Sequence, residues 1–104
     1  MEEKAMKLSD AILKGSRRGV KQGKDYLTDG HGAYCPLGMA CLAIGIKPKR
    51  TRGSSKLRKV FPILRQRIFC SIYPNKLEDI ITDMNDKKKY SLKHILSWLK
   101  RNGY

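Results

Sequence analysis

The sequence predicts a mainly α-helical fold: a single small domain of four to five short helices over residues 1–104. A chain of this length can bury one modest core but not two. Its hydrophobic content of 40% is ordinary for a globular protein. Apolar residues also recur at helical spacing in several separate segments. We expect at most one small β-hairpin, near residues 24–35.

The first predicted helix covers residues 2 to about 18, where apolar side chains recur every three or four residues. Gly15 and Gly19 are expected to end it. Turn-forming residues follow at positions 28–32, between Tyr26 and Tyr34. This arrangement is typical of a hairpin with one tyrosine on each arm.

The second predicted helix begins at Pro36, because proline suits the first turn of a helix, where its missing N–H costs nothing. It is expected to run to Ile44 and to stop at Gly45. A third helix is predicted over residues 57–68, capped by Ser54 or Ser55. Pro62 should kink this helix or start a new one.

Two further helices are predicted in the last third of the chain. Residues 75–78 have the form of a capping box, and an apolar stripe follows over residues 77–84. Residues 85–89 are expected to form a loop. Ser91 should cap the last helix, with Tyr90 packed onto Ile95 and Gly103 just past its end.

The cysteine pattern does not favour a metal site. Cys35 and Cys41 are six residues apart, Cys70 is alone, and His31 and His94 are distant in sequence. Zinc sites are typically built from more closely spaced pairs, and on a helix this spacing would point the two thiols to different faces. We therefore expect packing cysteines, with no metal, cofactor or catalytic residue. The start of a helix could still lower the pKa of the Cys35 thiol.

Charge is the most unusual property of the chain. Twenty-three Lys and Arg against nine Asp and Glu give a net charge of +14, and no acidic residue lies between Asp29 and Glu78. Such a field attracts polyanions, and clustered cations are typical of phosphate contacts. We expect a basic loop at about residues 47–56 and a binding surface made of nine cations: Lys47, Lys49, Arg50, Arg52, Lys56, Arg58, Lys59, Arg65 and Arg67.

Three features favour a location in the cytoplasm. The sequence has no apolar run long enough to span a membrane, and its first ten residues are acidic and amphipathic rather than signal-like. An odd number of cysteines fits a reducing compartment better than a disulfide scaffold. No membrane partner is expected, and the oligomeric state is left open.

Three short motifs resemble those of a family of small uncharacterised bacteriophage proteins. They read K-Q-G at residues 21–23, Y-C-P-L-G-M-A-C at residues 34–41, and N-D at residues 85–86 ahead of S-L-K-H-I at residues 91–95. The family typically carries K-Q-G, Y-C-C-L-G-V-L-C-D and N-D-x-G-x-S-F-x-E-I-A. The resemblance spans roughly residues 10–100. It implies a phage or phage-derived origin, hence a host cytoplasm, and no known activity.

The motif residues also suggest a candidate pocket. Gln22, Asn85 and Asp86 are polar residues at expected turns, which could meet near the start of the Cys35 helix. Asn and Asp at turns usually satisfy local backbone groups. We therefore favour a turn-forming role for Asn85 and Asp86, and a small-ligand pocket stays open as the alternative.

Three functions follow as expectations. The leading one is a non-enzymatic, phage-type accessory protein that binds nucleic acid through its basic surface. The second is an inhibitor that binds an acidic surface of a host protein, in an anti-defence or host-takeover role. The third is a small-molecule-binding protein that uses Gln22, Cys35, Asn85 and Asp86. The same cations serve the first two functions, so the sequence does not separate them.

Overall fold

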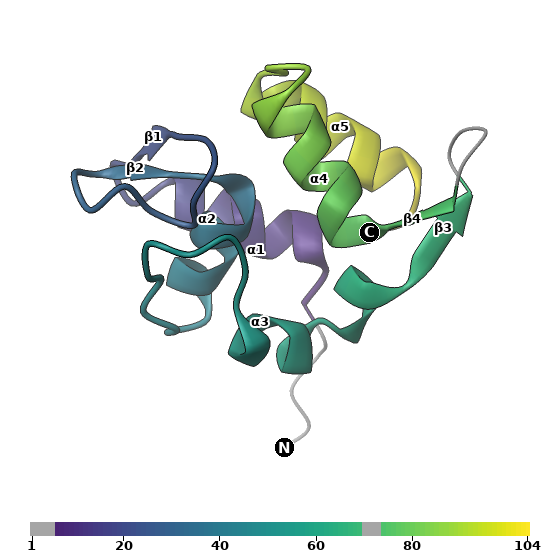
Figure 1. The fold of residues 1–104 in the computed structure, drawn as a ribbon, viewed down its shortest axis with the longest axis horizontal. Helices are drawn as coiled ribbons and strands as arrows, with labels where there is room; N and C mark the ends of the chain where they lie inside the picture. Colours follow the sequence, from purple (N-terminus) through teal and green to yellow (C-terminus); the bar gives the residue numbers. More distant parts are fainter. Residues whose placement is uncertain (1–5, 70–73) are drawn as a thin grey trace.

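Five α-helices account for most of the regular secondary structure in the computed structural model, which describes residues 6–69 and 74–104 (Figure 1). The mainly α prediction is confirmed. In chain order the elements are α1 (Leu8–Ser16), β1 (Lys21–Gln22), β2 (Ala33–Tyr34), α2 (Pro36–Ala43), α3 (Ser55–Val60), the 3-10 helix η1 (Pro62–Arg65), β3 (Arg67–Phe69), β4 (Pro74–Lys76), α4 (Leu77–Asp86) and α5 (Leu92–Arg101).

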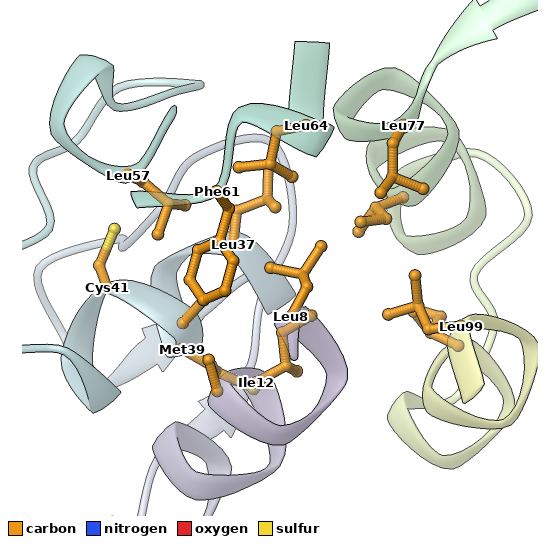
Figure 2. Packing of buried hydrophobic residues seen from close by; sticks show 14 of the residues in the cluster. Leu8, Ile12, Leu37, Met39, Cys41, Leu57, Phe61, Leu64, Leu77 and Leu99 are labelled. Carbon is orange, nitrogen blue, oxygen red and sulfur yellow. The ribbon is translucent and has the colours of Figure 1, made fainter. Parts of the chain in front are cut away.

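Helix α2 lies at the centre of the fold because its sequence, PLGMACLA, has no polar face. A helix that is apolar all round has to be covered on all sides. Helix α1 packs closely along α2, and α4 covers another side of it. The core then continues into α3, η1 and α5, and Figure 2 shows Cys41 and Phe61 within this cluster.

Two glycines bring backbones into direct contact around α2. A Cβ atom on Gly15 would lie 1.8 Å from the carbonyl oxygen of Met39, and one on Gly38 would lie 1.9 Å from that of Leu27. Gly15 lies inside α1 rather than at its end, so its predicted role as a helix stop is wrong. Its role is to let α1 approach α2.

Several predicted helix ends are confirmed. The Ser54 hydroxyl accepts a hydrogen bond from the Leu57 N–H at the start of α3, and the Ser91 hydroxyl accepts one from the His94 N–H at the start of α5. Pro62 ends α3 and begins η1, as expected of a residue that cannot continue a helix. The Tyr90 ring stacks on His94, with ring centroids 4.0 Å apart, and its predicted contact with Ile95 stays a prediction.

The region after η1 differs from the prediction. Residues 67–69 form strand β3 instead of continuing a helix, and they pair antiparallel with β4 at residues 74–76. Asn75 therefore lies in a strand. The N-cap of α4 is Lys76, without a side-chain cap, so the predicted capping box is wrong. A backbone bond from the Leu77 N–H to the Gln66 oxygen, 3.1 Å long, joins the two arms.

The hairpin predicted near residues 24–35 is present only as one antiparallel bridge, between Thr28 and Tyr34. The Asp29 carboxylate tightens this turn by accepting from the His31 and Ala33 N–H groups, which lowers the pKa of Asp29. The main pairing is parallel instead, between β1 and β2. The loop between them is joined to the basic loop by a 2.7 Å bond from the Leu27 N–H to the Thr51 oxygen.

Within residues 6–69 and 74–104, no helix is long and apolar enough to cross a membrane.

Candidate functional site

The basic segment, residues 47–67, contains all nine cations of the predicted binding surface. Figure 1 shows this part of the chain passing along one side of the molecule, from the loop after α2 through α3 and on to β3. Eight of the nine side chains belong to exposed residues, and none of those eight forms an ion pair within the described part of the chain. They are Lys47, Lys49, Arg50, Arg52, Lys56, Lys59, Arg65 and Arg67.

Arg58 is the one cation of the predicted binding surface that forms an ion pair within the described residues, and its assignment to that surface is wrong. Its guanidinium makes a two-pronged ion pair with Glu78, with Nε 2.9 Å from Oε1 and Nη2 2.8 Å from Oε2. The bound carboxylate raises the pKa of Arg58. Because this fork is already occupied, Arg58 serves to attach α3 to α4 and is not a free contact for a phosphate.

The remaining cations of the basic loop point to two sides. Lys47 and Lys49 line a cavity together with Lys56 from α3. Arg50 instead lies over the ring of Tyr26, 5.3 Å from its centroid, and Arg52 lines a small crevice beside Cys35 and α4.

The motif residues Gln22 and Asn85 do meet in the structure. The Gln22 amide donates to Asn85 Oδ1 at 2.8 Å and to the Tyr90 carbonyl at 2.9 Å. Its oxygen accepts from the Leu92 N–H at 3.0 Å, so Gln22 also satisfies a donor at the start of α5.

Asn85 lies in the last turn of α4, not in a loop, and is only 4% exposed. Its Nδ2 donates to the Gly23 carbonyl at 2.7 Å and to Asp86 Oδ1 at 2.8 Å. Asn85 therefore joins α4 to the loop after β1. The favoured turn-forming role is wrong for Asn85, because its backbone partner lies 62 residues away rather than in a local turn. Helix α4 itself ends beyond Asp86, where Lys89 adopts a positive φ of 54°.

Cys35 completes the group of four, but the enclosed space is small. The crevice bounded by Cys35, Asn85, Asp86 and their neighbours measures about 10 Å³, roughly the room that one water needs. A larger, open depression of about 490 Å³ lies beside Gln22, Lys24 and Lys89, and Asn85 lines it as well. A ligand function for these residues stays a prediction.

We expect Asn85→Ala to lower the free energy of unfolding by about 2 kcal/mol, because it leaves the Gly23 carbonyl and one N–H of the Gln22 amide without this partner. Asp86→Ala removes one acceptor of the Asn85 amide, and it should lower the free energy of unfolding by less. Urea denaturation measures both. If Asn85 has a purely structural role, any loss of ligand binding in the variant will be proportional to the loss of folded protein. Loss of ligand binding at an unchanged melting temperature would show a ligand-binding role instead.

The two described thiols are neutral. Burial raises the pKa of Cys35 from 9.0 to about 11, which outweighs the lowering by the Gly38 and Leu37 N–H groups. The expectation of a lowered pKa at this helix start is therefore wrong. Burial likewise raises the pKa of Cys41 to about 11. Cys41 is fully buried and packs in the core. Cys70 lies outside the described residues.

In a Cys70→Ser variant, iodoacetamide should react slowly with the native protein at pH 7. A pKa of about 11 for both remaining thiols leaves a thiolate fraction of about 10⁻⁴ at that pH. The alkylation rate of the native protein should rise as the pH approaches 11. When the protein is unfolded in urea, both thiols should react at the rate of free cysteine. Mass spectrometry of the alkylated peptides separates the two sites. A native thiol that reacts at the free-cysteine rate would contradict this account.

Among the residues that the structure describes, no three His, Cys, Asp or Glu side chains lie close enough together to hold a metal ion. The tyrosines differ in position. Tyr26 is 37% exposed and lies against Arg50, whereas Tyr34 and Tyr90 are half-buried and pack on the core.

The fold and the site define a small, mainly α-helical domain with a basic segment along one side. Comparison of the chain with protein-family models, with curated proteins and with solved structures finds no match. The resemblance to the phage family therefore stays a prediction.

Proposed function

We propose that this protein is a non-enzymatic accessory protein of the phage type that binds nucleic acid through its basic segment. The observation that carries the proposal is the set of eight exposed cations without an ion-pair partner in the described chain. A run of 48 residues without any carboxylate separates Asp29 from Glu78. This run leaves the field of those cations uncompensated by their neighbours in sequence.

The physical basis is the release of counterions. Lys and Arg side chains that neutralise phosphates displace condensed cations from the nucleic acid, and this gain does not depend on base sequence. Nothing in the chain has the pattern of a recognition helix or a ribonucleoprotein motif, so we propose binding that is largely independent of sequence. The phage origin rests on the three motifs alone.

The direct test is fluorescence anisotropy with short labelled DNA duplexes, single-stranded DNA and RNA at about 50 mM salt, where electrostatic binding is strong. We expect a Kd of about 1 µM or tighter for at least one of them. No binding at about 100 µM protein would overturn the proposal, since even non-specific binding is typically tighter at this salt. A pulldown from bacterial lysate whose partner survives nuclease would then favour an acidic host protein.

A further inference from the structure

A cavity of about 210 Å³ lies between the basic loop and the start of α3, within the basic segment. Lys47 and Lys49 from the loop and Lys56 from α3 line it, and Leu27 and Ile46 supply apolar wall. Cavities that hold drug-sized molecules measure about 300–1,000 Å³. This one suits a smaller group.

The charges around this cavity are all of one sign. No carboxylate is among the residues that line it, and none of its three lysines forms an ion pair within the described residues. Like charges gathered at a concave surface raise the local potential, because low-dielectric walls focus the field. A bound anion would be attracted by this potential.

Hydrogen bonds hold the wall that carries the lysines. The Thr51 carbonyl accepts from the Leu27 N–H at 2.7 Å, and the Thr51 N–H donates to the Lys49 carbonyl at 2.7 Å. The Thr51 hydroxyl donates to the Gly53 carbonyl at 3.0 Å. These contacts fix the loop backbone from Lys49 to Gly53, which lowers the ordering cost of binding.

The arginines of the same loop have other neighbours. Arg50 lies over Tyr26, and Arg52 lines the small crevice that Asp25 and Asp86 also line. Their charge is therefore partly engaged by an aromatic ring or lies near carboxylates. The cavity side of the loop is the side where positive charge is uncompensated.

We propose that this cavity is a phosphate-binding pocket, with Lys47, Lys49 and Lys56 around a single phosphate group. The proposal rests on the proposed function, since it assigns one nucleic-acid phosphate to a defined place in the basic segment. The rest of the segment then contributes non-directional attraction, and the pocket fixes the register of the bound strand.

Two variants with equal charge loss test the pocket. The pocket variant carries Lys47→Gln, Lys49→Gln and Lys56→Gln. The control variant carries Arg50→Gln, Arg52→Gln and Lys59→Gln, which lie outside the cavity lining. Equal melting temperatures establish that both are folded.

Inorganic phosphate is titrated against ¹⁵N-labelled protein. We expect the amide resonances of Thr51, Gly53 and Ser54 to shift in the wild type and in the control variant but not in the pocket variant. Both variants should lose oligonucleotide affinity, and the pocket variant should lose about tenfold more. Oligonucleotides with and without a 5′-phosphate are then compared. Tighter binding of the 5′-phosphorylated oligonucleotide would show that the pocket takes a terminal phosphate, and equal binding would show that it takes a backbone phosphate.

Equal affinity losses in the two variants, with shifts spread evenly over the basic segment, would overturn the pocket and leave nucleic-acid binding in place. Failure of the wild type to bind any oligonucleotide would overturn the proposed function itself, and the phosphate titration would still report on the cavity.

Discussion

Replacing Gly38 by Ala is expected to lower the free energy of unfolding by about 3 kcal/mol, at the upper end of the usual range for overpacking. The new Cβ atom would lie 1.9 Å from the Leu27 carbonyl oxygen and 2.8 Å from the carbon. Both are backbone atoms, so no rotamer change removes the overlap. Helix α2 is buried along nearly its whole length and cannot move aside without opening the core.

Urea denaturation of Gly38→Ala measures this effect, and Gly53→Ala is the matched control. At Gly53 the nearest atom to a new Cβ is Arg58 Nη2 at 2.5 Å, a side-chain atom that pairs with Glu78 and would have to shift. The control should therefore lose about 1 kcal/mol, clearly less than Gly38→Ala. Equal stability of Gly38→Ala and the wild type would show that the loop at Leu27 does not press on α2.

The Lys49→Ser, Arg50→Ser, Arg52→Ser variant is expected to bind nucleic acid about 100-fold more weakly at about 0.1 M salt. Each phosphate contact adds about 0.9 on duplex DNA, or about 0.7 on a single strand, to the slope of the logarithm of the association constant against the logarithm of salt concentration. At about 0.1 M salt, the loss of three contacts therefore lowers the association constant by roughly this factor. All three residues are exposed, and none forms an ion pair in the described chain, so the fold should survive. Anisotropy titrations measure the affinity, and circular dichroism melting checks the fold.

Arg58→Gln is the control for that variant, because it removes a cation from the same segment that is already paired with Glu78. It should lower stability by about 1 kcal/mol, a modest value because the pair is partly exposed. Its nucleic-acid affinity should stay close to that of the wild type. Equal losses of affinity in Arg58→Gln and Lys59→Gln would contradict the assignment of Arg58 to the fold.

Local signals in the sequence predicted much of the fold. Pro36 and Pro62 mark helix starts, and Ser54 and Ser91 act as caps, because each acts on backbone groups within four residues. Gly15 resembles a helix stop in sequence but is a contact point. Only the position of Met39 in the folded chain reveals this.

The strands were harder to predict because their pairing partners, like the contact of Gly15 with Met39, are set by the folded chain and not by neighbouring residues. Ile68 continues a helical apolar spacing, yet its segment pairs with the chain at residues 74–76. The parallel pairing of β1 with β2 likewise depends on the path of the ten residues between them. Pairing partners of this kind override the local preference of a short segment.

The candidate site was predicted in its residues but not in its arrangement. The Arg58–Glu78 pair spans 20 residues and the Asn85–Gln22 bond spans 63, and charge or motif patterns carry no information on such distances.

The salt dependence of nucleic-acid binding tests the central claim, that the basic segment binds phosphates, most directly. Kd is measured for wild-type protein at several salt concentrations between about 50 and 200 mM. If the basic segment contacts at least four phosphates, the logarithm of the association constant will fall with the logarithm of salt at a slope of about −3 or steeper. Binding that is absent at low salt, or whose slope is shallower than about −1, would contradict the claim.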